Sequence, residues 1–248
     1  MYVSDFKDFK NLILIKINVR VLYMIKTKFM DRNIDIWSKV NGIEWGKDLC
    51  WNDKPKINKY QNLIYSNASS KKHSLQLEFE DFVNPSQSIW LKKITLHNDS
   101  IEKQDLTLFF QQVFENRKGT AFFSLSNRSL YHEYNGNYML FNGLVDNKGI
   151  SQYTTWQEHD FQKKDIVNVE NGSLLYNPIS AGKVSSAFSL ETTVLPFEIK
   201  QVYYWIVSGE DLNEINNLNE VVKENPDYLI REFIENGICN ERTVPLSK

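Results

Sequence analysis

Residues 74–82 read SLQLEFEDF, and this stretch decides the fold class. Leu75, Leu77 and Phe79 alternate here with glutamine and glutamate. Because successive side chains of a strand point to opposite faces, such alternation predicts an extended strand. The pair Asn84-Pro85 follows at once, and proline cannot donate to a sheet ladder, so the strand is expected to end there. The stretch therefore predicts a strand with one buried face and one face in water.

The same period of two recurs along the first four fifths of the chain. It is longest at residues 13–25, where Ile, Val and Tyr share one face. Further strands are predicted at residues 88–97, 105–114, 120–125, 129–134, 138–145, 149–156, 183–195 and 200–207. Turn signals separate these runs, among them residues 116–119 and Asn135-Gly136. With no helical pattern between the strands, an all-β fold is favoured over a wound α/β sheet, and a large antiparallel sandwich is expected.

The pattern changes after residue 209. Apolar residues recur every three or four positions from Leu212 to Val222, which predicts an amphipathic helix that starts near residue 210. A second helix is predicted with Asn225 as its cap, Pro226 at its first position and Gly237 at its end. The chain is therefore expected to divide into a β-sandwich at residues 1–209, one or two linker helices at 210–237 and a tail at 238–248.

Composition excludes several classes of protein. The 248 residues carry 29 basic and 31 acidic side chains, so no basic surface for nucleic acid is expected. Cys50 and Cys239 match no metal or disulfide spacing. The apolar stretch at residues 10–29 is interrupted by Lys16 and Arg20 and resembles neither a membrane span nor a secretory signal. We therefore expect a cytoplasmic protein with no nucleic-acid or membrane partner.

The sequence contains no motif for a nucleotide, a hydrolase nucleophile or a zinc protease. Its four histidines lie in separate segments without ligand spacing, so neither a metal nor another cofactor is expected. His97 and His132 could instead meet on neighbouring strands as the acid and base of a mutarotase-like enzyme. In the alternative, both are half-buried strand residues with no chemical role. Carboxylate pairs such as Glu78 and Glu80 fall on the water face of a strand and mark no site.

A set of segments in a fixed order resembles one family. The segments include LEFEDFVNP at residues 77–85, IWLKKITLHN at 89–98, GTAFF at 119–123, LYHEY at 130–134, NPISAGKVSS at 177–186 and VYYWIVSG at 202–209. Together with weaker matches they cover residues 34–235. Their order resembles the N-terminal domain of prokaryotic glucoamylase-type glycoside hydrolases of family 15, which include glucodextranases and trehalase-like enzymes.

The resemblance implies a fold and a role. In that family the N-terminal domain is a β-supersandwich similar to galactose-mutarotase-like domains, and helices join it to an (α/α)6 barrel. Two glutamates of the barrel hydrolyse α-glucosidic bonds with inversion. No residue here matches either glutamate, and the sequence ends where the barrel would begin. The resemblance therefore implies a non-catalytic domain, with a separate or lost barrel polypeptide as its partner and an α-glucan or oligosaccharide as the ligand.

Three functions stay open at this point. A domain that supports a barrel predicts an exposed apolar surface on the C-terminal helices or on one sandwich face. A stand-alone carbohydrate-binding sandwich predicts a groove lined by Trp and Tyr. A mutarotase-like enzyme predicts a histidine and a carboxylate of shifted pKa in one pocket.

One segment combines suitable side chains for contact with a glucan or a barrel. Tyr153 and Trp156 lie in a predicted strand, and Glu158 and His159 follow it directly. Aromatic rings can stack on sugars, and the acidic and imidazole groups can bind hydroxyls. The alternative is an ordinary surface loop, with the aromatic rings packed in the core.

Overall fold

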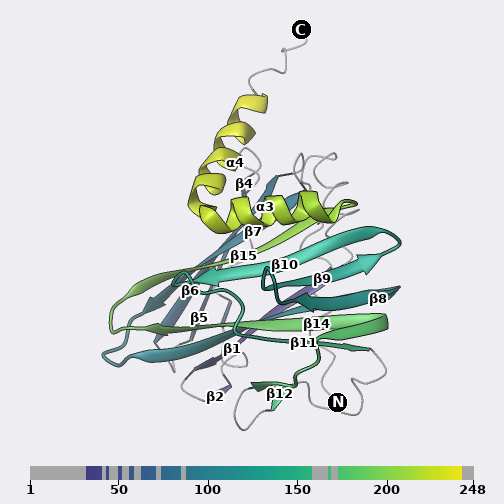
Figure 1. Cartoon of the computed structure of the whole chain (residues 1–248). Coiled ribbons are helices and arrows are strands. Elements are labelled where there is room, and N and C mark those ends of the chain that lie inside the picture. Colours follow the sequence, from purple (N-terminus) through teal and green to yellow (C-terminus); the bar gives the residue numbers. More distant parts are fainter. Residues whose placement is uncertain are drawn as a thin grey trace.

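The computed structural model describes residues 32–40, 43–44, 50–51, 56–58, 63–70, 74–84, 88–157, 167–168 and 173–241. Antiparallel strands form one curled sheet whose two layers face each other, and helices lie on the outside of one layer (Figure 1). In the described part of the chain the helices are α3 (Leu212–Glu224) and α4 (Pro226–Glu241). The predicted all-β sandwich with C-terminal helices is confirmed. The alternating stretch at residues 13–25 lies outside the described residues.

Several strands agree closely with the predicted runs. Residues 129–134 were predicted as a strand and form β9, and residues 138–145 fall within β10. The strands in chain order are β1 (Arg32–Val40), β2 (Ile43–Glu44), β3 (Cys50–Trp51), β4 (Lys56–Asn58), β5 (Leu63–Ser70), β6 (Leu75–Asn84), β7 (Ile89–Asn98), β8 (Gln104–Ser124), β9 (Ser129–Tyr134), β10 (Asn137–Val145), β11 (Gln152–Gln157), β12 (Val167–Asn168), β13 (Ser173–Leu174), β14 (Ile179–Val194) and β15 (Ile199–Gly209).

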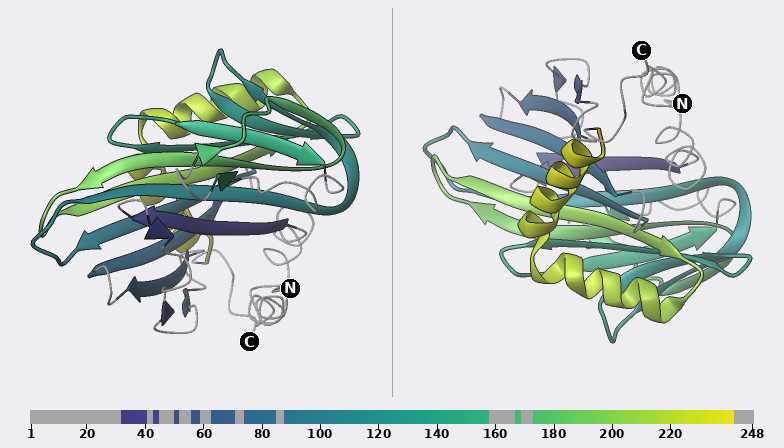
Figure 2. Two further views of the ribbon diagram at one scale, coloured as in Figure 1. Left: turned by 90° about the horizontal axis from the view of Figure 1, so that it is seen from below. Right: turned by 90° about the horizontal axis from the view of Figure 1, so that it is seen from above.

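Two long strands carry the sheet from one layer to the other. The first half of β8 pairs with β1 and with the second half of β14, whereas the second half of β8 pairs with β9 and with the first half of β14. The helix-bearing layer then continues in the order β9, β10, β15, β7, β6 and β5. The second layer consists of β1, β11 and the remaining halves of β8 and β14. Figure 2 shows β8 bending round at one end of the molecule.

The turn predicted at residues 116–119 is wrong, because β8 continues through it. Lys118 pairs with Lys183, and the next pair is Val113 with Ser185. Four residues of β8 therefore lie between these pairs, opposite one residue of β14. Such a bulge bends and twists a strand. The turn-forming residues therefore make the bend between the two layers instead of a hairpin. A Cβ on Gly119 would lie 2.1 Å from the carbonyl oxygen of Glu133, so the bend requires glycine there.

The core between the layers contains a group of stacked aromatic rings. Phe110 of β8 and Phe188 of β14 stack with their ring centroids 5.1 Å apart. Tyr204 of β15, in the opposite layer, stacks on Phe110 at 4.8 Å, and Trp90 of β7 meets Tyr204 edge to face. Burial of one such ring stabilises the fold by about 1.5–3 kcal/mol. This core holds the two layers together.

A second core lies between the helices and the outer face of the helix-bearing layer. Ile215 and Val222 of α3 and Phe233 of α4 are buried against Trp205 and Val207 of β15. These helix residues follow the spacing of one helical face, so the predicted amphipathic pattern positions both helices. Figure 2 shows the helices covering this face of the sheet.

Local capping interactions set the start of both helices. The Asp211 carboxylate accepts hydrogen bonds from the backbone of Asn213 and Glu214 and so caps α3. Asn225 Oδ1 accepts from the Tyr228 backbone nitrogen at 3.0 Å and caps α4. The predicted end at Gly237 is wrong, because α4 continues to Glu241. A glycine inside a helix costs about 1 kcal/mol relative to alanine, which lowers stability without ending the helix. None of the described helices is long and apolar enough to cross a membrane.

Buried hydrogen bonds fix α3 to the sheet. Asn219 is fully buried, and its Oδ1 accepts from Trp205 Nε1 at 3.0 Å and from Asn142 Nδ2 at 3.1 Å. Asn142 Nδ2 also donates to Ser129 Oγ at 2.8 Å. Because each of these groups is out of contact with water, only one rotation of α3 about its axis satisfies them.

A second set of polar contacts fixes the start of α4. Tyr203 Oη donates to Asp227 Oδ2 at 2.7 Å, and Lys93 Nζ lies 3.2 Å from Asp227 Oδ1. Burial and the neighbouring Asp227 carboxylate raise the pKa of Tyr203 strongly, so its hydroxyl is protonated at neutral pH. The orientation of both helices on the sheet is thus set by specific hydrogen bonds as well as by apolar packing.

Candidate functional site

Three aromatic rings form a shelf at the rim of the core between the layers. Tyr153 of β11 stacks on Phe123 of β8 at a centroid distance of 3.6 Å and an interplanar angle of 8°. Tyr176, in the segment before β14, meets Tyr153 at 5.4 Å and 60°. Tyr176 is 71% exposed, whereas Phe123 and Tyr153 are half-buried. We call Phe123, Tyr153 and Tyr176 the aromatic shelf.

The backbone that carries Tyr176 is held on both sides. On one side the Thr155 backbone nitrogen donates to the Asn177 carbonyl at 2.9 Å, and Asn177 Nδ2 donates back to the Thr155 carbonyl at 2.9 Å. On the other side the Phe123 backbone nitrogen donates to the Pro178 carbonyl at 2.9 Å. The segment therefore bridges β11 and the end of β8. Tyr176 is exposed but stands on a fixed backbone.

The electrostatics of the shelf are simple. Tyr153 Oη donates to Tyr176 Oη at 3.3 Å, and this bond, with some burial, raises the pKa of Tyr153 to about 12. Arg128 lies close enough to oppose this rise in pKa. It occupies a turn with φ of 52° and donates from Nη2 to the Ile150 carbonyl at 2.8 Å. The Tyr153 phenol is thus neutral near pH 7, and the fixed Arg128 cation stands beside it.

The sequence-predicted site residues are not all brought together. Tyr153 belongs to the shelf. Trp156 is 6% exposed and packs with Phe109, Leu174 and Ala187 in a separate cluster on the second layer. Glu158 and His159 lie outside the described residues. Tyr176 was missed because its segment has no periodicity, although Tyr176 directly precedes Asn177-Pro178, a turn signal that places a side chain at the surface.

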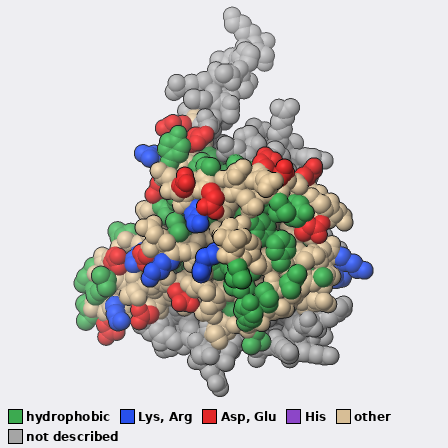
Figure 3. Space-filling model, in the orientation of Figure 1, with side chains coloured by type: hydrophobic (Ala, Val, Ile, Leu, Met, Phe, Trp, Pro, Cys, Tyr) green, Lys and Arg blue, Asp and Glu red, His purple; other side chains and the backbone are tan. Residues whose placement is uncertain are grey.

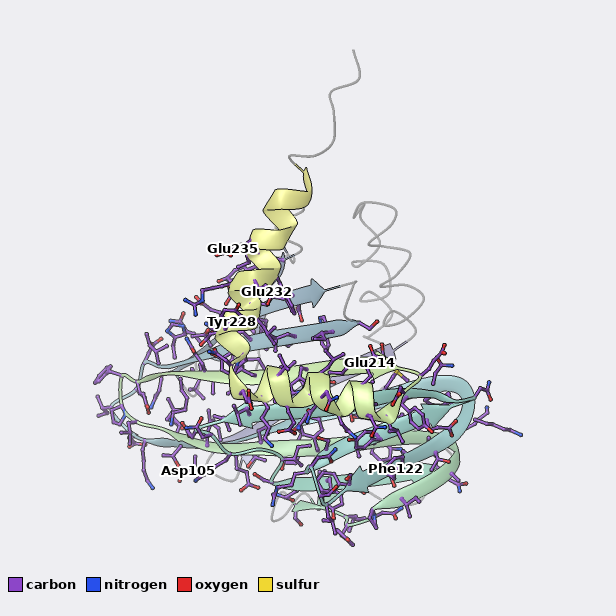
Figure 4. The ribbon with its side chains drawn as sticks, turned by 45° about the horizontal axis from the view of Figure 1, so that its top comes forward. Asp105, Phe122, Glu214, Tyr228, Glu232 and Glu235 are labelled. Carbon is purple, nitrogen blue, oxygen red and sulfur yellow. The ribbon has the colours of Figure 1, made fainter. Side chains whose placement is uncertain are left out.

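A second candidate surface lies on the two helices. Leu212, Val221 and Tyr228 are 36–55% exposed there. Residues 210–235 contain eight acidic and two basic side chains, a net charge of -6 against -2 for the whole chain. Acidic side chains gather over the helices in Figure 3, and Figure 4 shows Glu214, Tyr228, Glu232 and Glu235 spaced along them. We call residues 210–235 the acidic helix face.

A third exposed apolar group lies at the turn between β14 and β15. Leu195, Phe197 and Ile199 are 56–69% exposed, and Ile101 in the loop after β7 is 81% exposed. Phe197 has a φ of 58°, which is unfavourable for a bulky residue. Asn98 joins the two loops, since its Nδ2 donates to the Leu195 and Glu102 carbonyls. These contacts hold the turn in place, but they do not indicate a binding site for a ligand.

The histidine pair of a mutarotase-like enzyme does not form. His97 lies on β7 and His132 on β9, with β15 and β10 between these strands, so the two histidines do not meet on neighbouring strands. His132 is fully buried, and its ring contacts Ser186 Oγ at 2.7 Å and Tyr134 Oη at 3.0 Å. His97 is partly exposed and lies 3.8 Å from Glu78. The two rings therefore cannot act on one substrate.

The buried carboxylate in the described residues is an ion pair rather than a catalytic acid. Asp81 Oδ1 lies 2.9 Å from Lys92 Nζ, with both side chains nearly buried. Burial raises the pKa of Asp81, and the Lys92 ammonium opposes this rise. Lys92 also lies over the rings of Phe79 and Trp90. Among the described residues no group of three or more His, Cys, Asp or Glu side chains could hold a metal ion.

Comparison with known proteins supports the architecture. No protein-family model matches the sequence, and no curated protein matches it. A bacterial glucoamylase complexed with acarbose has a TM-score of 0.59 at 14% identity, over 86% of this chain and 32% of the glucoamylase. A human-microbiome protein described as a kojibiose phosphorylase has a TM-score of 0.53 at 9% identity, over 82% of this chain and 27% of that protein. The chain spans less than a third of either protein and shares with them the fold of that part.

Proposed function

We propose that this chain is the non-catalytic β-supersandwich of a glucoamylase-type glycoside hydrolase, and that it orients a separate (α/α)6 barrel that acts on α-glucans. The observation that carries the proposal is the fold, which 86% of this chain shares with a third of a bacterial glucoamylase. The order of sequence segments resembles the N-terminal domain of the same kind of enzyme. The order of the segments and the fold therefore favour the same assignment.

The acidic helix face is the surface on which we place the barrel. Both helices are held rigidly, α3 by the buried Asn219 and α4 by the contact of Asp227 with Tyr203. Their outer side combines exposed apolar residues with a net charge of -6, so a partner with an apolar centre and a basic rim would be complementary. In this role the sandwich supplies a rigid platform, and the barrel supplies both catalytic glutamates.

The described carboxylates support a non-catalytic role. An inverting glycosidase needs an acid and a base about 6.5–9.5 Å apart across an open site. Asp81 is buried against Lys92. Glu80 has a raised pKa because it is half-buried, but it lies near Lys93 and Asp227 under the start of α4. Each of these two carboxylates therefore has a lysine beside it, Lys92 for Asp81 and Lys93 for Glu80.

The test uses the purified full chain. Incubation with maltotriose is expected to release no glucose. Affinity capture with the tagged chain from its source cells is expected to retain a protein with an (α/α)6 barrel, and addition of the chain should raise glucose release by that protein. The matched variant Glu214→Lys/Glu232→Lys reverses two charges of the acidic helix face and should lose the capture at unchanged stability. Glucose release by the chain alone would contradict the proposal. Undiminished capture of the barrel protein by the charge-reversed variant would contradict it as well.

A further inference from the structure

The shelf presents an aromatic ring to water on a fixed support. Tyr176 is the most exposed aromatic side chain of the described residues, and an exposed ring forgoes the free energy of burial. Its backbone is nevertheless hydrogen-bonded to β11 through Asn177 and to β8 through Pro178. The ring is therefore held in place without a packing role of its own. This combination is typical of a side chain that contacts a ligand.

The geometry of the rings fits a flat ligand with an apolar face and a polar rim. Tyr153 is braced from behind by Phe123, nearly parallel to it, and Tyr176 stands at 60° to Tyr153. The two tyrosines thus form an open corner whose hydroxyl groups meet at 3.3 Å. A hexose ring has C–H groups on one face and hydroxyl groups around its edge. Its C–H face can pack on one tyrosine ring while its hydroxyls reach the two phenol oxygens.

The segments of the shelf carry little charge, which suits a neutral ligand. The segments that build it are residues 121–128, 150–157 and 173–180, and Arg128 is the single charged side chain in them. Its guanidinium already donates to the Ile150 carbonyl, so it is fixed at the rim and retains other N–H groups for a hydroxyl. The acidic helix face, by contrast, carries a net charge of -6. The two surfaces therefore differ in the chemistry of the partner they suit.

From these observations we infer that the aromatic shelf binds one or two hexose units of a neutral oligosaccharide. The choice of a glucose-based ligand rests on the proposed function. A protein is the competing occupant, since Leu125 and Ile179 are also exposed on these segments. A stable protein interface buries about 800 Å² on each partner, however, and a shelf of two rings is closer in size to a sugar unit.

The experiment is a calorimetric titration of the full chain with maltotriose, with cellotriose as a second neutral probe. The wild type should bind maltotriose saturably with weak affinity. Tyr176→Ala removes the exposed ring and should weaken binding about tenfold or more. Tyr176→Phe keeps the ring and loses one hydroxyl, so its affinity should stay within about threefold of the wild type. Phe197→Ala, at the turn between β14 and β15, removes an aromatic ring of similar exposure away from the shelf and should bind as the wild type does.

Three outcomes would overturn the inference. The first is a wild type that shows no saturable binding of either trisaccharide, and the second is an equal loss in the Tyr176→Ala and Phe197→Ala variants. The third is self-association of the chain that depends on Tyr176 without sugar binding, which would make the shelf a protein-docking surface. The titration contains no barrel, so its result is independent of the capture experiment. Sugar binding without barrel capture would refute the proposed function alone, and capture without sugar binding would refute the shelf alone.

Discussion

Replacement of the buried Asn219 by alanine should destabilise the protein far more than replacement of an exposed asparagine of the same helix. The Asn219 oxygen is the acceptor that the structure gives to the Trp205 indole, and it also accepts from Asn142. Asn142 keeps its bond to Ser129, but the fully buried indole N–H loses its acceptor. An orphaned buried donor costs about 1–3 kcal/mol. With a small cavity added, we expect Asn219→Ala to lower the free energy of unfolding by about 2–3 kcal/mol.

Urea unfolding followed by tryptophan fluorescence measures this loss. The matched control is Asn217→Ala, which changes an exposed asparagine of the same helix and should alter stability by less than about 0.5 kcal/mol. A double-mutant cycle with Trp205→Phe isolates the contact, because the phenyl ring needs no acceptor. The double variant should be more stable than the sum of the single losses implies, by about 1 kcal/mol. Equal effects of Asn219→Ala and Asn217→Ala would refute the reasoning.

Three further predictions concern the fold. Asp227→Ala should cost about 1 kcal/mol and lower the pKa of Tyr203, so tyrosinate absorbance should appear at lower pH than in the wild type. Because the folded-state pKa of Tyr203 lies above its usual 10.0, the stability it contributes is complete below pH 10 and is lost as the pH rises further; a denaturation series that shows no alkaline loss would contradict this. Gly143→Ala should cost about 1–3 kcal/mol, since a Cβ there would lie 2.8 Å from Leu190 and 2.9 Å from the Tyr203 carbonyl, whereas Gly149→Ala meets only one atom at 3.8 Å and should leave the melting temperature unchanged.

Much of the fold is predictable because one physical rule dominates it. Strands such as β6 and β7 have one face in the core, so buried and less buried residues alternate along their sequences. The bend in β8 is not predictable in this way. The residues around Gly119 favour a turn locally, and only pairing with distant β14 converts that turn into a bulge. The helix end predicted at Gly237 is wrong for a similar reason, since a glycine ends a helix only where the chain also leaves the helical path.

The site is less predictable than the fold because exposed side chains leave no periodic signal. Tyr153 could be singled out by its aromatic surroundings, but the same argument selected Trp156, whose ring is buried against Phe109. Sequence alone does not show which face of an edge strand is covered. Tyr176 lies 23 residues from Tyr153, and their contact follows only from the way Asn177 joins its segment to β11.

The two surfaces to which we assign functions depend on different hydrogen bonds, and this separation gives each assignment a clean test. The acidic helix face is set by Asn219 and Asp227, which bind the helices to β15. The shelf is set by Asn177, whose side chain holds the Tyr176 segment against β11. Asp227→Ala should therefore weaken capture of a barrel and leave maltotriose binding intact, whereas Asn177→Ala should do the reverse. If both variants lost both activities, the shelf and the helix face would have to form a single site, and neither assignment could stand as stated.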